Sequence, residues 1–311
     1  MKKIIFLVAT LFGSFAHAQS SYKFLTVDYS PKAAALGGIY VCSTDDPIAF
    51  FYNPASVRLI EKGTTSFAYS KFLLDINGAS AATVFEVENI GKFATGIQYV
   101  NYGSFTKADE NGNKLGNFSA NDIALSAAYS YEYFENFNVG VSAKIIYSGI
   151  EKYSSTAAAF DFGILYSFVK HLLNLGLSLN NFGTQLSAYS SVKEELPLDL
   201  RFGVTKKLEQ APLKFYAGFY NLLDKDLSFA DKIKQYALAL EFDPGKTLVL
   251  RFSYDGNKRN DLKVASSAGL SGISLGVGLR FEKFNFDYSF SSWGEIGSVH
   301  RLGIMANMND F

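Results

Sequence analysis

The sequence predicts an all-β protein, a transmembrane antiparallel β-barrel of about 14 strands with an N-terminal plug segment. Three observations predict this fold. Long segments alternate apolar and polar residues, an even number of them fills the chain after residue 63, and the long connections all fall at one end of the expected barrel. The 29 Phe, 19 Tyr and 26 Gly, against 6 Pro, fit a sheet whose outer face meets lipid.

The start of the chain is typical of a secretory signal peptide. Two lysines precede an apolar run, and Ala16 and Ala18 are small residues at the positions that a signal peptidase reads. The apolar run is too short to span a bilayer as a helix. The chain is therefore expected to divide into a signal peptide at 1–18, a plug segment at 19–63 and an outer-membrane β-barrel at 64–311.

Alternation with a period of two is the strongest pattern. In 275–281 every second residue is Leu, Val or Phe, and the residues between them are Gly and Arg. Because successive side chains of a strand point to opposite faces, such a segment has one apolar and one mixed face. The segments are long enough to cross a bilayer at a tilt. The expected strands are 64–74, 77–88, 91–104, 119–134, 138–151, 154–170, 171–184, 197–208, 212–224, 235–244, 246–256, 271–282, 283–293 and 297–308.

The connections between these strands give an independent check. The long connections are expected at 105–118, 185–196, 225–234 and 257–270, after the third, seventh, ninth and eleventh strands. If the amino terminus is periplasmic, every odd strand ends outside the cell, so all four would be extracellular loops. Long extracellular loops and short periplasmic turns are typical of outer-membrane barrels.

A soluble β-sandwich or lipocalin-like barrel would show the same alternation, with the apolar face in a core. The polar faces favour the membrane barrel, because they are rich in Gly, Ala and Ser, whereas a solvated sheet normally carries many more Lys and Glu. The scattered charges on these faces are expected to pair with one another, since buried charges need partners; a solute path through the lumen is the alternative. These charges are Lys144, Asp161, Arg201, Arg251, Arg280 and Arg301.

Residues 20–63 break the alternation. Asp46 before Pro47 is a typical helix start, and the apolar run that follows should end at Asn53, because Pro54 disfavours helix in the residue before it. This small, Gly-rich segment is expected inside the lumen as a plug, and a periplasmic extension beneath the barrel is the alternative. The plug motif consists of Gly37, Gly38, Asp45, Asp46, Pro47, Asn53 and Pro54.

These residues also carry a resemblance. Leu36-Gly37-Gly38, Asp45-Asp46-Pro47 and Asn53-Pro54-Ala55 resemble the N-terminal region of the FadL-like outer-membrane barrel superfamily, and more closely the PorV/PorQ family of the Bacteroidetes type IX secretion system. Residues 96–103, 108–113 and 196–204 resemble the PorQ branch, and the likeness covers nearly all of the mature chain. The resemblance implies a scaffold of the attachment complex at the outer membrane, where extracellular loops anchor a PorZ-like surface protein. A FadL-like transporter of hydrophobic small molecules is the alternative function.

Besides outer-membrane lipid, the expected partner is therefore the PorZ-like protein; nucleic acid is not expected, because the net charge is zero and no basic tract occurs. Loops on a rigid scaffold commonly carry recognition. The candidate partner-binding loop residues are Phe105, Asp109, Glu110, Asn111, Tyr189, Lys193, Asp224 and Lys225.

No catalytic, cofactor-binding or metal-binding residues are expected, and so no enzyme. Ser167 and Lys170 match the Ser-x-x-Lys of penicillin-recognising enzymes, but on a strand positions three apart face opposite ways. The mature chain offers only His171, His300 and Cys42 as further candidates, far apart in sequence. They suit neither a metal site nor a nucleophile with its base.

Overall fold

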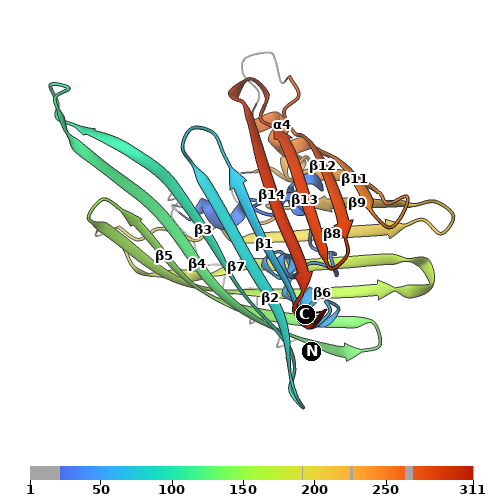
Figure 1. The fold of residues 1–311 in the computed structure, drawn as a ribbon. Helices are drawn as coiled ribbons and strands as arrows, with labels where there is room; N and C mark the ends of the chain where they lie inside the picture. The colour runs from blue at the N-terminus through green and yellow to red at the C-terminus, as the bar shows by residue number, and fades with distance from the viewer. Residues whose placement is uncertain (1–21, 191, 225–226, 263–268, 311) are drawn as a thin grey trace.

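The computed structural model describes residues 22–190, 192–224, 227–262 and 269–310, so the predicted signal peptide lies outside the described residues. Fourteen antiparallel strands close into one barrel, in which each strand pairs with its neighbours in sequence and β1 pairs with β14 (Figure 1). The predicted fold class is confirmed. The strands are β1 Thr64–Lys71, β2 Asn77–Val87, β3 Gly91–Ala108, β4 Lys114–Phe134, β5 Phe137–Ile150, β6 Tyr153–Phe168, β7 Leu173–Ser187, β8 Asp199–Lys207, β9 Leu213–Phe219, β10 Tyr236–Phe242, β11 Leu248–Asp255, β12 Ile273–Phe281, β13 Phe284–Ser292 and β14 Ser298–Asn307.

The predicted apolar face of each strand points outward. Along β4, Leu125 is 54% exposed and Tyr131 is 55% exposed, whereas Ser126 and Ser130 between them are buried. Exposed aliphatic and aromatic side chains encircle the barrel in this way, and we call them the apolar belt. Members from ten strands are Phe67, Leu125, Ile145, Phe162, Leu177, Phe215, Leu238, Phe252, Leu275 and Leu302. A continuous apolar surface of this extent fits hydrocarbon surroundings better than water. Among the described residues, no helix is long and apolar enough to cross a membrane.

The two ends of the barrel differ. At the end that we call the long-loop end, the connections 188–198, 220–235 and 256–272 are long and include α3 Phe229–Ile233 and α4 Gly256–Asp261. At the opposite end, the short-turn end, the turns are short and include η4 Val169–His171, and η6 Met308–Asp310 follows the last strand. The long connections after β7, β9 and β11 thus lie on one side of the barrel, as predicted.

The fourth predicted loop, 105–118, is wrong. Strands β3 and β4 continue through most of it as a two-stranded ribbon closed by a turn at 109–113, and the rings of Phe105 and Phe118 stack with centroids 5.3 Å apart. Strand β2 pairs with β3 only as far as Asn101, so the ribbon projects beyond its neighbours at the upper left of Figure 1. Both faces of the ribbon are exposed, and therefore the sequence shows no apolar alternation there.

The N-terminal segment forms four short helices, η1 Lys23–Thr26, α2 Pro31–Ala35, η2 Pro47–Phe51 and η3 Pro54–Arg58. The helix predicted after Asp46 begins there, because the Asp46 carboxylate accepts a hydrogen bond from the Ile48 amide at 3.0 Å. It is a short 3-10 helix that ends at Phe51, two residues before the predicted end at Asn53, and Asn53 caps the next helix.

The core of the barrel consists of this segment and the inward faces of the strands. Phe50 and Phe51 belong to an apolar cluster with Ala82, Ala94 and Ala128 of three strands. A second cluster joins residues near the start of the described chain to the wall; it includes Tyr22, Phe24, Tyr29, Ala124, Ala157 and Leu196. Residues 22–60 therefore fill the lumen instead of extending beneath the barrel.

Candidate functional site

Inward-facing glycines make room for the segment in the lumen. A Cβ atom on Gly218 of β9 would lie 2.7 Å from Ile39, and a Cβ atom on Gly303 of β14 would lie 2.7 Å from Pro31. We call the glycines with such close contacts to the segment the glycine belt: Gly78, Gly96, Gly140, Gly163, Gly176, Gly218, Gly276 and Gly303. The belt explains part of the high glycine content of the chain, since only glycine lets the segment approach the backbone of the wall this closely.

Gly37 and Gly38 form the turn that ends α2. Their φ angles are 66° and 76°, and the Gly38 amide donates a hydrogen bond to the Ala33 carbonyl at 2.9 Å. Left-handed backbone at two successive positions is unfavourable for residues with a side chain, so glycine is required here. The turn directs the chain from α2 toward Ile39 and the wall of the barrel.

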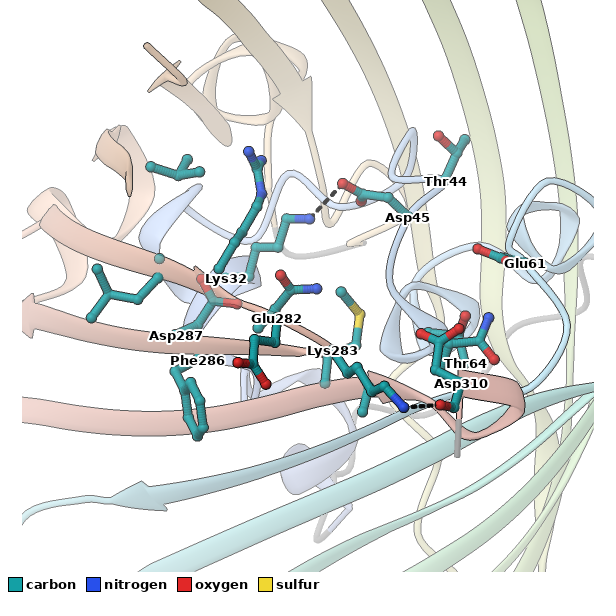
Figure 2. A pocket seen from close by; sticks show the side chains of 18 of the residues that line it. Lys32, Thr44, Asp45, Glu61, Thr64, Glu282, Lys283, Phe286, Asp287 and Asp310 are labelled. Atoms are coloured by element: carbon teal, nitrogen blue, oxygen red, sulfur yellow. Dashed lines mark hydrogen bonds and ion pairs between the residues drawn. The ribbon is translucent and has the colours of Figure 1, made fainter. Parts of the chain in front are cut away.

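The two aspartates of the plug motif have different partners. The Asp46 carboxylate accepts hydrogen bonds from the Tyr40 hydroxyl and from the Ser66 hydroxyl of β1, both at 2.8 Å. Asp45 forms an ion pair with Lys32 at 2.7 Å, which Figure 2 shows as a dashed line. Asp46 therefore attaches the segment to the wall, whereas Asp45 joins two parts of the segment to each other.

Asn53 and Pro54 contact the wall directly. The Asn53 amide donates hydrogen bonds to the Val41 carbonyl at 2.8 Å and to the Ile164 carbonyl of β6 at 3.0 Å. Pro54 lies against Gly140 of the glycine belt. From the other side, Asn180 of β7 donates to the Phe51 carbonyl at 3.0 Å. The polar residues of the plug motif thus hold the segment inside the barrel.

Most of the inward charges form ion pairs, as predicted. Lys144 and Asp161, with side chains 1% and 0% exposed, lie 2.9 Å apart. Arg201 pairs with Asp199 at 2.5 Å, and Arg251 pairs with Glu241 at 2.7 Å and with Asp287 at 2.5 Å. Arg301 instead donates to the Asp28 carbonyl at 2.7 Å. Arg280 lies at the short-turn end of the inward face, where it is 41% exposed and pairs with Asp243 at 2.8 Å.

One of the long connections is attached to the segment in the lumen. Lys258 of α4 reaches the Asp28 carboxylate at 3.1 Å, and the Tyr52 hydroxyl donates to the same carboxylate at 2.9 Å. Burial alone would lower the pKa of Lys258, but the facing carboxylates of Asp28 and Asp255 raise it above its ordinary value. The connection 256–272 at the long-loop end is therefore joined to the N-terminal segment by an ion pair.

Two cavities open at the short-turn end, with volumes of about 480 Å³ and 730 Å³. Asp45 and Arg280 line both of them. The smaller cavity, shown in Figure 2, is also lined by Lys32, Arg251 and Asp287. The smaller cavity has a mainly charged and polar lining, which suits water or a polar solute and does not resemble the mostly apolar pocket that a hydrophobic ligand requires. The larger cavity has a mixed lining, which includes Phe168, Leu172 and Leu213.

The candidate partner-binding residues lie on three different parts of the structure: the ribbon and the connections after β7 and β9. Phe105 lies on the ribbon, and Asp109, Glu110 and Asn111 form its turn, where the Asp109 carboxylate accepts hydrogen bonds from the Asn111 and Asn113 amides at 2.9 Å and 2.8 Å. Lys193 is exposed on the connection after β7, Asp224 lies on the connection after β9, and Lys225 lies outside the described residues.

Tyr189, the remaining candidate, lies on the connection after β7 and turns inward. Its side chain is half-buried and donates a hydrogen bond to the Ser148 hydroxyl of β5. Leu196, on the same connection, is buried against the segment in the lumen. The connection 188–198 therefore folds inward over the lumen, which local sequence patterns do not reveal.

The two histidines and the cysteine that were considered for catalysis or metal binding lie far apart in the structure. His171 is exposed in a turn at the short-turn end, and His300 lies on the outer face of β14. The Cys42 thiol is buried and donates to the Gly203 carbonyl at 3.1 Å. Within the described residues, no group of three or more His, Cys, Asp or Glu side chains could hold a metal ion.

Comparisons with known proteins identify the fold. No family profile and no curated protein sequence matches this chain. Among solved structures, a FadL homologue from Pseudomonas aeruginosa has a TM-score of 0.54 at 12% identity, covering 95% of this chain and 100% of that one. The toluene transporter TbuX of Ralstonia pickettii has a TM-score of 0.57 at 10% identity, covering 90% and 97% of the two chains. The toluene transporter TodX of Pseudomonas putida has a TM-score of 0.59 at 13% identity, covering 90% and 98%.

These likenesses support the FadL-like part of the sequence resemblance at the level of fold. At such low identity a shared fold does not fix a shared function. The PorQ branch stays a prediction from the sequence motifs.

Proposed function

We propose that the protein is an outer-membrane barrel that works as a scaffold, with its long-loop end outside the cell. In this role it belongs to an attachment complex of the kind that the type IX secretion resemblance implies, and it anchors a PorZ-like surface protein. The FadL-like fold and the apolar belt support the location in the outer membrane.

The packing of the lumen is the observation that carries the scaffold proposal. Residues 22–60 fill the barrel, fit against the glycine belt and are hydrogen-bonded to the wall through Asp46 and Asn53. A solute could pass only if many of these contacts broke together. A filled barrel is, however, a rigid support, and the ribbon and the connections 188–198, 220–235 and 256–272 offer a large surface at one end.

A second candidate function is transport of hydrophobic small molecules. The structural comparisons favour it over the scaffold, because two of the three similar structures are described as toluene transporters and the third as a FadL homologue. Against it, the smaller of the two cavities at the short-turn end has a mainly charged and polar lining. Transport would require the N-terminal segment to move away from the wall.

Affinity purification of the tagged full-length protein from its native cells tests the scaffold. We expect a PorZ-like surface protein, identified by mass spectrometry, to copurify with it. Replacing 105–118 by an Asn-Gly turn shortens the ribbon, and replacing 208–213 by the same turn is the matched control at the short-turn end. Ribbon shortening should reduce recovery of the partner, whereas the control should not.

Uptake of toluene by intact cells tests the second candidate. Under the scaffold proposal, deletion of the protein leaves toluene uptake unchanged and impairs display of the surface partner. Loss of toluene uptake with normal surface display would refute the scaffold and support the channel.

A further inference from the structure

A row of polar side chains interrupts the apolar belt on the outer face of β2, β1 and β14, at the long-loop end. Asn77, Lys71 and His300 stand directly opposite one another in the registers of these strands. All three point outward, because the alternate residues, such as Ser70, face the lumen and are buried. Directly opposed residues on one face of a sheet have Cβ atoms about 4.5–5.5 Å apart, so the three side chains form one surface.

Two tyrosines below this row hold its flanking members in place. The Tyr69 hydroxyl donates to the Asn77 side-chain oxygen at 2.6 Å, and the Tyr288 hydroxyl lies 2.8 Å from His300 Nδ1. The other ring nitrogen of His300 lies 3.1 Å from the Ser298 hydroxyl. Tyrosines with an apolar ring and a polar tip are typical of the interface between hydrocarbon and lipid headgroups. The row therefore marks the headgroup level of the membrane.

Lys71 lies at the centre of the row as a free cation. No described residue forms a hydrogen bond or an ion pair with its ammonium group. The nearest acid in sequence, Asp75, packs against Gly103 of β3, on the far side of β2 from His300. The Asn77 amide donates to the Asp75 carbonyl at 2.8 Å, and both ring nitrogens of His300 have hydroxyl partners, so the two side chains are held in place. The ammonium group of Lys71 between them is the group that can donate to an anion.

The surface below the row is apolar in every strand. The next outward row is Ala79, Tyr69, Leu302 and Tyr288, and the one below it is Ala81, Phe67, Ile304 and Phe286. A ligand for this surface needs an anionic group at the level of Lys71 and hydrocarbon beneath it. A phosphorylated lipid has both, with one end to accept hydrogen bonds and chains to cover the apolar rows.

We propose that Lys71, Asn77, Ser298 and His300 form a binding site for the phosphate group of an outer-leaflet lipid, with the acyl chains lying along Leu302, Phe67 and Ile304. The inference rests on the proposed location and orientation in the outer membrane, and not on the scaffold role. A scaffold without its PorZ-like partner would still bind this lipid.

Native mass spectrometry of the detergent-purified full-length protein, titrated with lipid A, tests the proposal. We expect one lipid A molecule to be retained, and Lys71→Ala to weaken retention about tenfold, because a hydrogen bond to a charged group contributes enough to change affinity by that factor. Lys71→Arg keeps the charge and should restore binding. His300→Ala should weaken retention as well, since it removes both the imidazole and the partner of Tyr288.

Lys152→Ala is the matched control. Lys152 is also exposed at the long-loop end, where its ammonium lies 5.4 Å from the centroid of the Tyr153 ring, but no imidazole stands opposite it. Equal retention by Lys71→Ala and the unchanged protein, or an equal loss in Lys152→Ala, would overturn the proposal. Fully dephosphorylated lipid A should be retained weakly, and inorganic phosphate should not displace lipid A at equal concentration. Displacement by inorganic phosphate would show an anion site without a lipid ligand, which also contradicts the proposal.

Discussion

At the residue scale, the glycines of the wall set how closely the N-terminal segment approaches it. Gly163 of β6 and Gly140 of β5 leave the space that Asn53 and Pro54 occupy. The same part of the wall contains the Lys144–Asp161 ion pair, whose acid also accepts hydrogen bonds from the Ser142 hydroxyl at 2.6 Å and the Asn181 amide at 2.8 Å. Small side chains and fully paired charges thus occur together where the segment meets β5, β6 and β7.

Gly163→Ala should destabilise the protein by about 1–3 kcal/mol, because the new methyl group would overlap the Asn53 side-chain oxygen. Urea unfolding in detergent micelles, followed by fluorescence of the single tryptophan, Trp293, measures this free energy. Gly245→Ala is the control, since a Cβ atom there meets nothing within 4 Å. Equal stability of the two variants would show that the segment does not lie against Gly163.

Asp161→Asn should lower the free energy of unfolding by about 3–5 kcal/mol, since it leaves the buried Lys144 ammonium without its counter-charge. The same urea titration measures the effect. Glu86→Gln breaks the exposed Lys62–Glu86 pair, whose atoms lie 3.4 Å apart, and should cost at most about 1 kcal/mol. A loss for Asp161→Asn no larger than that for Glu86→Gln would contradict the buried placement of the pair.

At the scale of elements, the N-terminal segment and the ribbon each depend on the barrel. The helices of the segment are too short to persist alone, so contacts with the wall determine their positions. The ribbon extends a strand pair that the barrel already holds, and an isolated two-stranded ribbon would be marginal in water. The segment packs against the wall inside the barrel, which suits a plug. The ribbon is held by the barrel at its base and is exposed beyond it, which suits a docking surface.

Removal of 22–60, with the signal peptide retained, should open the barrel to ions. Many residues of the inner wall are small or charged, such as Ser126, Ser130 and Arg251, and water can solvate them once the segment is absent. Conductance in planar bilayers is the measurement, with a heat-dependent shift in gel migration as evidence of a folded barrel. The intact protein should give no steady conductance; if it conducts as well as the shortened form, the segment is not a plug.

At the scale of the whole molecule, the unequal ends determine how the barrel can work. The ribbon and the long connections share one end, and the chain ends at the other (Figure 1). The apolar belt between them has the character of a lipid-facing surface. The molecule is therefore suited to contact a partner on one side of a membrane.

Cysteine labelling in intact cells tests this orientation. Asn111→Cys, in the turn of the ribbon, should react with a membrane-impermeant maleimide, whereas Glu135→Cys, in a short turn at the opposite end, should not. The native thiol does not interfere, because burial raises the pKa of Cys42 to about 12 and keeps it from solvent. Labelling of Glu135→Cys alone would mean that the long-loop end faces the periplasm.

The sequence by itself determined the number of strands, their outward faces and the start of the helix after Asp46, because alternation and capping depend on neighbours in the chain. The plug motif read from the sequence also includes Asp46 and Asn53, which hold the segment to the wall. Only the tertiary structure decided that the ribbon replaces a loop, that Tyr189 turns inward and that Asn77, Lys71 and His300 form one row. Those features depend on strand register and on contacts between residues far apart in sequence, and a pattern of single residues contains no information about either.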